Sequence, residues 1–516
     1  MSTPGSDSRK QARTRFAIAG VALPVLAAVI IFACCDRITS PGTLFHTTFA
    51  EQGLGAIFSG EFPAVRLEFL QKSFSDQSLL FHIFLYLTHW LPLAGQLLFL
   101  LAICFFCALS AAKNLNLRMR SFFAGSLLFL FAAVPLFDGL TAVTPDIFAV
   151  SALLLAFGIM GGEMTEKQRL IRLSVLAFIS AWSFPCPQIV LIPALLTGLL
   201  QLRKGALLAP LKPFAAGVCA MFAGLLIHPH PINTLSMWKL HNWDRILDAL
   251  SVSYDPFLTD PALLSPSGKE MLLAVPVLLL VFVALMLRIR LQENRGRGAV
   301  SPAVTACLIT AGFFTLAFFW VKSALLFAAP AGVLAFLSLG DTFLRGEQSP
   351  YKDQWKKIAW GFFAAVLLLT ALTAVLYVKT VPAVTVPVKI GEYLEKNLPE
   401  GTPVLNGNRQ DFPRLYAAAP HCSWQWGTDP AFATESDRQK MKLLIRAAHP
   451  EFSLVQRNGK VSFEADRISA KRLLGFYRTA YAVILEPDQD ARDVMLDNGW
   501  KVLHTVPGEG WILTVK

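Results

Sequence analysis

Charged residues are scarce in this chain, and their scarcity excludes an ordinary soluble protein. Of 516 residues, 16% are charged and 54% are hydrophobic, whereas in soluble domains about a quarter of the residues are charged. The mean hydropathy is +0.51. Apolar runs of roughly 16–22 residues recur along the sequence, and such runs are long enough to cross a bilayer. We therefore expect a polytopic α-helical membrane protein.

The sequence also lacks features that would indicate other classes of protein. It has no Gly-rich phosphate loop, no internal repeat and no low-complexity tract. Cys104 and Cys107 lie inside an apolar run without histidine or acid beside them, whereas a structural zinc site needs four ligands. A transporter often places charges near the bilayer midplane in repeated halves, but these apolar runs are almost free of charge.

We interpret eleven apolar runs as membrane spans. The second run is long, and its first part is interpreted as a surface helix that leads into the span. The fifth and sixth runs are short, and they are either two tilted spans or one re-entrant hairpin. The eleven runs are 16–35, 79–112, 121–137, 146–160, 171–184, 188–201, 214–228, 271–287, 301–319, 324–339 and 358–377.

The charges between these runs predict the topology. The loops on one side hold 21 basic and 7 acidic residues, and the opposite loops up to residue 377 hold 7 basic and 12 acidic residues. The positive-inside rule then places the basic tail 1–15 in the cytoplasm and the long loops 36–78 and 229–270 outside an inner (cytoplasmic) membrane. The net charge of +11 therefore reflects topology and the inner leaflet, and we expect no nucleic acid partner.

An odd number of spans leaves residues 378–516 outside the membrane, after a transmembrane module at 16–377. This region has nearly equal numbers of basic and acidic residues and no spanning run. Its alternating strand and helix patterns predict a small layered α/β domain. The predicted elements are a helix at 388–397, a strand at 402–405, a helix at 438–448, a strand at 481–485, a helix at 488–498 and a strand at 511–515.

The first outer loop carries many ionisable side chains for so apolar a chain. Ionisable groups held against a bilayer are costly, so we interpret them as functional; the alternative is a solvated, partly helical surface loop. The candidate catalytic residues are Asp36, Glu51 and Asp76. His46 and His82 are candidate ligands of a divalent metal, although no spacing in the outer loops matches a metal motif.

Basic residues of the outer loops are candidates for binding the phosphate of a lipid-linked substrate. Lys322 lies in a four-residue outer turn between two spans. Such a lysine either snorkels to the interface or supplies a fixed cation for a phosphate. The candidate substrate-binding residues are Arg66, Lys239, His241, Arg245 and Lys322.

This pattern resembles the C-type glycosyltransferases (the GT-C superfamily), whose members include protein O-mannosyltransferases and the aminoarabinose transferases of lipid A. The similar features are an acid at the outer end of the first span, Asp36, and an acidic approach to the second, Asp76. Thr144-Pro145-Asp146 is similar to the Arg-Pro-Asp of many members, with Thr in place of Arg, and also suits a helix N-terminus. Residues 411–416 and 427–432 are similar to the outer domains of uncharacterised members.

The resemblance implies transfer of a sugar from a polyprenyl-phosphate donor in the membrane to an outer lipid, glycan or protein acceptor. Such a transfer needs a base near the acceptor oxygen and a place for the departing phosphate. We expect Asp36 to be the base and Lys322 the first phosphate contact. The alternatives are a transporter and a non-catalytic scaffold that displays the outer domain. In the enzyme, we expect the outer domain to gate or orient the acceptor, because it lacks a convincing catalytic constellation.

The topology can be tested by labelling single cysteines with a membrane-impermeant reagent. The positive-inside rule predicts that residue 116 is labelled only from the cytoplasmic side and that residues 60, 250 and 450 are labelled only from outside. Labelling of residue 450 from the cytoplasmic side would contradict an outer location for the C-terminal domain.

Overall fold

The chain is described by a computed structural model that divides into two compact units. Unit 1 comprises Met1–Ser40, Gln77–His228 and Ala262–Ala383, and unit 2 comprises Pro41–Asp76, Pro229–Pro261 and Val384–Lys516. Within these units the structure describes residues 40–66, 70–115, 117, 142–202, 209–244, 266, 268–295, 300–346, 383–427, 432, 454–457, 460–463, 479–497 and 499–515.

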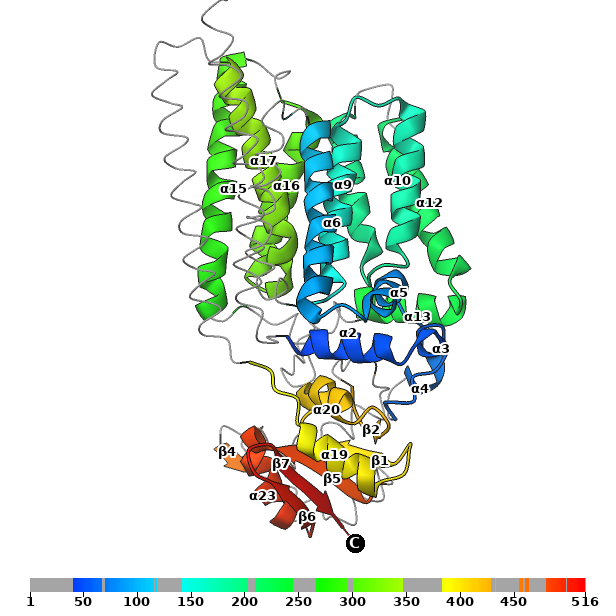
Figure 1. The fold of residues 1–516 in the computed structure, drawn as a ribbon. Helices are drawn as coiled ribbons and strands as arrows, with labels where there is room; N and C mark the ends of the chain where they lie inside the picture. Colours follow the sequence, from blue (N-terminus) through cyan, green and yellow to red (C-terminus); the bar gives the residue numbers. More distant parts are fainter. Residues whose placement is uncertain are drawn as a thin grey trace, which may run out of the picture. The chain divides into compact units, whose positions relative to one another are not determined.

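Unit 1 is a helical bundle (Figure 1). In it α6 packs against α9, α10 against α12, and α17 against both α15 and α16. The α-helices are α5 (Leu79–Thr88), α6 (Leu93–Asn114), α9 (Asp146–Gly161), α10 (Glu166–Ser180), α11 (Ile192–Leu200), α12 (Lys212–Ile227), α15 (Gly268–Arg295), α16 (Pro302–Phe318) and α17 (Leu325–Gly346), and the 3-10 helices are η1 (Pro187–Leu191), η2 (Ala209–Leu211) and η5 (Lys322–Ala324).

Four helical segments of the described residues are long and apolar enough to cross a membrane. They are Leu93–Asn114, Ala209–Ile227, Ala274–Leu291 and Lys322–Phe343. The shorter apolar helices are Leu79–Thr88, Asp146–Gly161, Pro187–Leu200 and Pro302–Phe318. All of them fall on predicted runs. The predicted spans at 16–35, 121–137 and 358–377 lie outside the described residues, so the count of eleven stays a prediction.

The long second run is two helices, as expected. Helix α5 ends at Thr88, and α6 begins at Leu93 after Pro92, whose backbone is extended. Proline has no N–H to donate, so it interrupts a helix and suits its first turn. The side-chain amide of Gln96 donates to the Thr88 carbonyl at 3.1 Å and closes the corner between the two helices.

The two short runs at 171–184 and 188–201 have different neighbours. Helix α10 packs mainly on α12, whereas α11 packs on α16 and α9. The chain between them turns through Phe184-Pro185-Cys186-Pro187 and continues as η1. The two runs are thus separate helices joined by a turn, and whether each of them crosses the membrane stays a prediction.

Small residues let the helices of unit 1 approach closely. A Cβ added at Gly158 of α9 would lie 2.9 Å from the Cα of Ala111 in α6, and one at Gly224 of α12 would lie 2.8 Å from the carbonyl oxygen of Phe178 in α10. Lipid tails are as apolar as side chains, so helices in a bilayer associate through close packing and not through the hydrophobic effect. The two glycines therefore support a membrane bundle.

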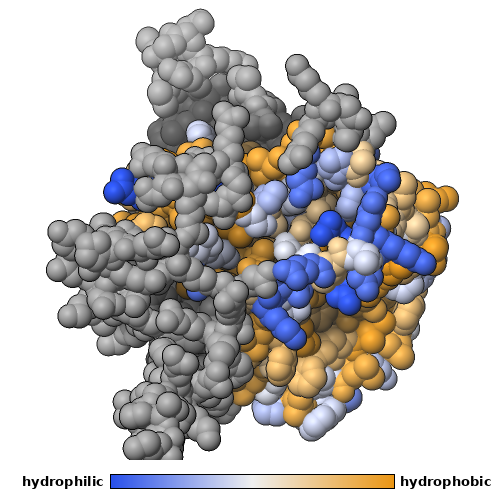
Figure 2. Space-filling model, turned by 90° about the horizontal axis from the view of Figure 1, so that it is seen from above, coloured by the Kyte–Doolittle hydropathy of each residue, from blue (hydrophilic) through white to orange (hydrophobic). Residues whose placement is uncertain are grey.

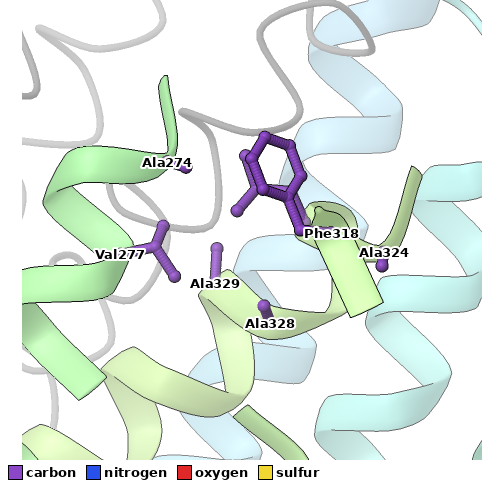
Figure 3. Packing of buried hydrophobic residues seen from close by; sticks show 7 residues of the cluster. Ala274, Val277, Phe318, Ala324, Ala328 and Ala329 are labelled. Carbon is purple, nitrogen blue, oxygen red and sulfur yellow. The ribbon is translucent and has the colours of Figure 1, made fainter. Parts of the chain in front are cut away.

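A buried cluster joins three helices of the bundle. Ala274 and Val277 of α15, Phe318 of α16, and Ala328 and Ala329 of α17 meet there (Figure 3). The Phe318 ring is 1% exposed and is surrounded mainly by small side chains. One large ring among alanines fills the space between closely spaced helices, which is the packing expected for membrane spans.

The flanks of the bundle are apolar. Figure 2 shows hydrophilic residues gathered toward the middle of one end, with hydrophobic residues around them. Phe106 of α6 and Phe313 and Leu316 of α16 are among the large apolar side chains that remain exposed. Exposed apolar area of this extent is unusual on soluble proteins and is typical of a surface that faces lipid.

Unit 2 contains a five-stranded mixed sheet in the order β2-β1-β5-β7-β6. β1 pairs in parallel with β2 and β5, and β7 pairs antiparallel with β5 and β6. The strands are β1 (Pro403–Asn406), β2 (Ser423–Trp424), β5 (Tyr481–Leu485), β6 (Lys501–Val506) and β7 (Gly510–Thr514), with a separate antiparallel pair, β3 (Leu454–Arg457) and β4 (Lys460–Phe463).

The helices of unit 2 come from three parts of the sequence. The C-terminal part supplies α19 (Val388–Asn397), α20 (Phe412–Ala418) and α23 (Gln489–Asp497), with the 3-10 helices η6 (Arg409–Asp411) and η9 (Glu486–Asp488). The first outer loop supplies α2 (Pro41–Glu51), α3 (Leu54–Ile57) and α4 (Leu70–Ser73), and the second supplies α13 (Pro231–Lys239) and the π-helix η3 (Leu240–Asp244).

Most predicted elements of the outer domain are confirmed. The helix at 388–397 and the strand at 481–485 have the predicted bounds, and the strand at 402–405, the helix at 488–498 and the strand at 511–515 differ by a residue. The predicted helix at 438–448 lies outside the described residues. Strand β5 is central and is buried from Ala482 to Leu485, which explains its continuous apolar sequence.

A carboxylate in the β6–β7 turn caps helix α19. The two oxygens of Glu509 accept the backbone N–H groups of Lys389 at 3.2 Å and of Ile390 at 2.9 Å. The first N–H groups of a helix have no partner within the helix, and its N-terminus carries a partial positive charge. Glu509 satisfies both requirements and ties α19 to the sheet.

Replacing this cap should destabilise the outer domain measurably. We expect Glu509→Ala to lower the free energy of unfolding by about 0.5–2 kcal/mol, the usual cost of losing a helix cap. Denaturant titration of the purified chain in detergent would measure it, with Glu400→Ala as the control because Glu400 is exposed. Equal unfolding curves for the two variants would contradict a capping role for Glu509.

Candidate functional site

The approach to α5 is a buried stretch of polar residues. Ser75, Asp76, Gln77 and Ser78 are all buried, and Asp76 is 4% exposed. Burying a polar group is costly unless it is hydrogen-bonded, and burying a carboxylate costs more. A buried acid in an outer loop is therefore a strong candidate for a functional group, and this stretch was selected from the sequence for Asp76.

The two outer loops meet within unit 2, beside Asp76 in the sequence. The hydroxyls of Ser75 and Thr234 lie 2.6 Å apart, and the side-chain amide of Asn233 donates to the Phe74 carbonyl at 2.9 Å. The Ser75 N–H points to the sulfur of Met237 at 3.1 Å. Helix α13 of the second loop thus holds the last residues of the first loop in place.

A second contact between the loops involves His230. Its Nε2 lies 2.9 Å from the carbonyl oxygen of Phe58. A Cβ at Gly60 would lie 2.9 Å from the imidazole ring. The imidazole therefore occupies space that a side chain at position 60 would fill. The Gly60 carbonyl also accepts a hydrogen bond from the Phe74 N–H at 2.8 Å. The histidine acts here as an interfacial hydrogen-bonding group, and sequence analysis did not select it.

The other acids of the site prediction differ from Asp76 in their surroundings. Glu51 is the last residue of α2 and is exposed, and within the described residues it has no recorded hydrogen bond or ion pair. Asp36 lies outside the described residues. Of the two described candidates, Asp76 has the environment of a functional acid, because burial and fixed neighbours are what set such a group apart.

Arg66 and Lys239, two predicted phosphate contacts of the outer loops, differ in burial and in ion pairing. Arg66 is half-buried and in the described part of the chain forms no ion pair, while its backbone N–H donates to the Trp424 carbonyl at 2.9 Å. Lys239 is exposed and lies 3.8 Å from the Asp244 carboxylate, which partly offsets its charge. Arg66 is therefore better suited to a phosphate than Lys239.

The remaining candidates of the second loop have other surroundings. The ring of His241 lies edge-on to Phe432, with centroids 5.0 Å apart, so it contacts the C-terminal part of unit 2. An imidazole in such a contact packs as an aromatic ring. Arg245 lies outside the described residues, so its role as a phosphate contact stays a prediction.

In unit 1, Lys322 occupies the turn predicted for it. It begins η5, between the end of α16 at Phe318 and the start of α17 at Leu325, and is half-buried. Trp320 beside it is largely exposed, as expected for an aromatic residue at a membrane interface. The lysine is thus held at the end of two apolar helices.

Asp146 lies at a helix N-terminus, as its sequence context predicted. It is the first residue of α9, and its carboxylate accepts a hydrogen bond from the Thr144 hydroxyl at 3.3 Å. No side-chain capping bond forms at this N-terminus, and the Asp146 side chain is exposed. The acid complements the helix dipole.

The described residues do not form a metal site. No group of three or more His, Cys, Asp or Glu side chains among them could hold a metal ion. His46 lies in α2 beside the Phe45 ring, in unit 2, and His82 is buried in α5, in unit 1. His46 and His82 belong to no such group within the described residues, so the divalent metal stays a prediction, and we derive no reaction step through one.

Sequence analysis missed a pair of carboxyl groups in the outer domain. Asp411 follows β1 and Asp488 follows β5, and because these strands are adjacent and parallel, their carboxyl ends lie at the same edge of the sheet. Arg414 pairs with Asp411 at 3.3 Å, and its Nε donates to the Thr385 carbonyl at 2.8 Å. Burial and the Asp488 carboxylate raise the pKa of Asp411 to about 7.

Several solved structures resemble this chain, among them an oligosaccharyltransferase and an arabinofuranosyltransferase. The apo oligosaccharyltransferase of Archaeoglobus fulgidus has a TM-score of 0.60 at 10% identity, covering 95% of this chain and 74% of that one. ArnT from Cupriavidus metallidurans bound to undecaprenyl phosphate has a TM-score of 0.56 at 12% identity, covering 96% and 98%. The mycobacterial arabinofuranosyltransferase AftD has a TM-score of 0.51 at 13% identity, covering 98% and 40%.

These similarities show the fold. No protein-family model and no curated protein sequence matches the chain. The chain has the fold of the C-type glycosyltransferases, as its sequence pattern predicted, with a C-terminal domain built around a small sheet. These folds belong to membrane proteins, in agreement with the apolar helices of unit 1.

The raised pKa of Asp411 predicts how stability depends on pH. The folded chain holds this proton up to about pH 7, whereas the unfolded chain loses it near pH 4, so stability should fall as pH rises through that window. Each unit of pKa difference corresponds to about 1.4 kcal/mol. We expect Asp411→Asn to abolish at least that much of the loss between about pH 5 and about pH 8.

Thermal unfolding of the purified chain in detergent at the two pH values would measure this effect. Asp493→Asn is the matched control, because Asp493 is exposed and pairs with its neighbour Arg492. If wild type and Asp411→Asn lost the same stability between the two pH values, the pKa of Asp411 would not be raised.

Proposed function

We propose that this chain is a membrane glycosyltransferase that moves a sugar from a polyprenyl-phosphate donor to an acceptor outside the membrane. The observation that carries the proposal is the fold, which covers 96% of this chain and 98% of ArnT, a structure that contains undecaprenyl phosphate. The archaeal oligosaccharyltransferase AglB, with a TM-score of 0.57, contains a dolichol-phosphate. The shared chemistry of these two lipids supports a polyprenyl-phosphate donor here.

The reaction needs two functions that different residues would supply. A base removes the proton of the acceptor hydroxyl, and the oxygen then attacks the anomeric carbon of the sugar. The bond from that carbon to the phosphate oxygen breaks, and the phosphate leaves with the bonding electrons. A single displacement of this kind inverts the anomeric configuration. A fixed cation near the phosphate stabilises the charge that develops on it.

Asp36 is our proposed base, and Lys322 our proposed phosphate contact. Asp36 directly follows the first apolar run, where a carboxylate meets both the membrane surface and an outer acceptor. Lys322 begins the short helix η5 between two apolar helices, where a lysine could meet the phosphate of a lipid headgroup. Asp76 is the second candidate base because it is buried, and Arg66 is the second candidate cation because it lacks an ion pair in the described structure.

The location follows from the same proposal. We infer that the N-terminal tail lies in the cytoplasm, that the protein spans the inner membrane, and that residues 378–516 lie outside, because the basic loops alternate with acidic ones. The acceptor is then an outer lipid, glycan or protein.

The two proposed residues should fail in different ways when they are replaced. Asp36→Asn keeps size and hydrogen bonding but removes the proton acceptor, so kcat should fall by about 10²–10⁴-fold. Lys322→Ala should mainly weaken binding of undecaprenyl phosphate, because it removes a charge-assisted contact. Transfer assays with a radiolabelled sugar on undecaprenyl phosphate, and binding of the unlabelled lipid, would separate the two effects.

Matched variants make the assignment decisive. Asp76→Asn and Glu51→Gln are assayed beside Asp36→Asn, all at equal levels in the membrane. Near-normal transfer by Asp36→Asn would exclude Asp36 as the base and leave Asp76, then Glu51. Failure of the wild-type chain to use any polyprenyl-phosphate sugar or to bind undecaprenyl phosphate would favour the scaffold or transporter alternatives.

A further inference from the structure

Aromatic side chains join the first outer loop to helix α20 within unit 2. The Phe45 ring of α2 has its centroid 6.2 Å from that of Phe412 and 6.1 Å from that of Tyr416. Phe62, later in the same loop, lies 6.5 Å from Phe412 and 5.9 Å from Tyr416. Phe62, Phe412 and Tyr416 are each less than 5% exposed. Rings at these distances contribute more than their buried area alone.

The same loop extends the edge of the outer sheet by one isolated bridge. Val65 forms a parallel bridge with Trp424 of β2, the strand at one end of the sheet order. The Trp424 N–H donates to the Ala64 carbonyl at 2.8 Å, and the Arg66 N–H donates to the Trp424 carbonyl at 2.9 Å. This resembles strand addition to a sheet edge, a common way of recognising an extended peptide, and here the peptide belongs to the same chain.

A side-chain hydrogen bond fixes the register of this added segment. The Ser423 hydroxyl donates to the Pro63 carbonyl at 3.0 Å. Since shifting a strand by one residue turns its side chains to the other face, this bond also fixes which face Arg66 presents. The candidate phosphate-binding arginine is thus oriented by the outer domain.

The aromatic contacts continue from the outer domain to the candidate acids. The Phe62 ring stacks on Phe74 with centroids 5.3 Å apart, and Phe49 lies 5.6 Å from Phe74. Phe74 is two residues before Asp76, and Phe49 is two residues before Glu51. Phe49, Phe62 and Phe74 are buried, so a displacement of α20 would move the backbone that carries both acids.

We propose that Phe412 and Tyr416 are positioning residues for sugar transfer, because they hold the first outer loop in the shape that places Asp76. The inference rests on the proposed function of the chain. It assigns the outer domain a role in the reaction itself, beyond orienting the acceptor. Phe412 and Tyr416 act through Phe62 and Phe74 and touch no substrate.

The aromatic ring of Tyr416 positions the first outer loop, and the hydroxyl group of Tyr416 is not needed for this. Burial strongly raises the pKa of Tyr416, and no hydrogen bond of its hydroxyl is recorded in the described structure. Tyr416→Phe keeps the ring and removes an unbonded polar group, so it is a conservative control. Tyr393→Ala is a second control, because Tyr393 stacks on His504 at 4.3 Å in the outer domain, away from the aromatic path.

The experiment compares four single variants of the full chain in detergent or nanodiscs. Phe412→Ala and Tyr416→Ala should speed amide hydrogen exchange at residues 41–66 and lower kcat by about 100-fold, because a misplacement of about 1 Å can cost that much in rate. The donor KM and the binding of undecaprenyl phosphate should change by less than about threefold, since positioning affects the reacting geometry more than binding. Tyr416→Phe and Tyr393→Ala should behave as wild type.

A milder variant covers the case in which the alanine variants do not fold. Ser423→Ala removes one hydrogen bond from the added segment and should lower kcat by about fivefold, the equivalent of a typical hydrogen bond. Ser423→Thr keeps a hydroxyl and should restore the rate. Ser423→Ala and Ser423→Thr leave all the aromatic rings in place, so they test only the effect of the register between the loop and β2.

Different outcomes overturn different conclusions. Unchanged exchange at residues 41–66 in Tyr416→Ala, or faster exchange with a normal kcat, would overturn the positioning role and leave the glycosyltransferase proposal standing. An equal loss of undecaprenyl phosphate binding and of kcat would also overturn it. A wild-type chain without any transfer would overturn the proposed function, while the exchange data would still show whether the rings hold the loop.

Discussion

The mutual burial of aromatic rings from distant parts of the sequence organises unit 2. Phe62 contacts α20 of the C-terminal region on one side and Phe74 of its own loop on the other. Without these partners the first outer loop has only short helices, and short helices are marginal in water. The loop therefore owes its shape to the outer domain, and the second loop completes it through the Ser75–Thr234 contact.

Local patterns in the sequence predict much of the fold. Apolar runs place the helices of unit 1, and alternating patterns place α19, β1, β5, α23 and β7, because burial against lipid or a sheet imposes a period that the residues must follow. Partners distant in the sequence are harder to predict. Nothing near Pro63–Arg66 predicts pairing with β2, because two backbone hydrogen bonds and one bridge carry it. Backbone groups are the same in every residue type, so the sequence of the segment does not reveal them.

In the candidate site, too, local features are predictable from the sequence and distant contacts are not. Sequence analysis selects Asp76 by its charge in an apolar context, and its burial agrees. It also selects Lys239, whose nearby Asp244 is brought to 3.8 Å by the turn of η3. It does not select Asp411, because burial and the neighbouring Asp488 carboxylate, which raise the pKa of Asp411, arise only when β1 and β5 pair in parallel. Charge type is readable from sequence, but the environment of a charge depends on tertiary contacts.

The bond between Ser423 and Pro63 joins residues 360 positions apart, and this separation has a consequence for biogenesis. At roughly 5–20 residues per second, the ribosome needs on the order of 20–70 s to make β2 after it has made the loop. During that time the phenylalanines of the loop lack their partners in α20. Such apolar surface is prone to aggregation and to capture by chaperones. Packing of the first loop therefore has to wait until residues 412–424 have been made.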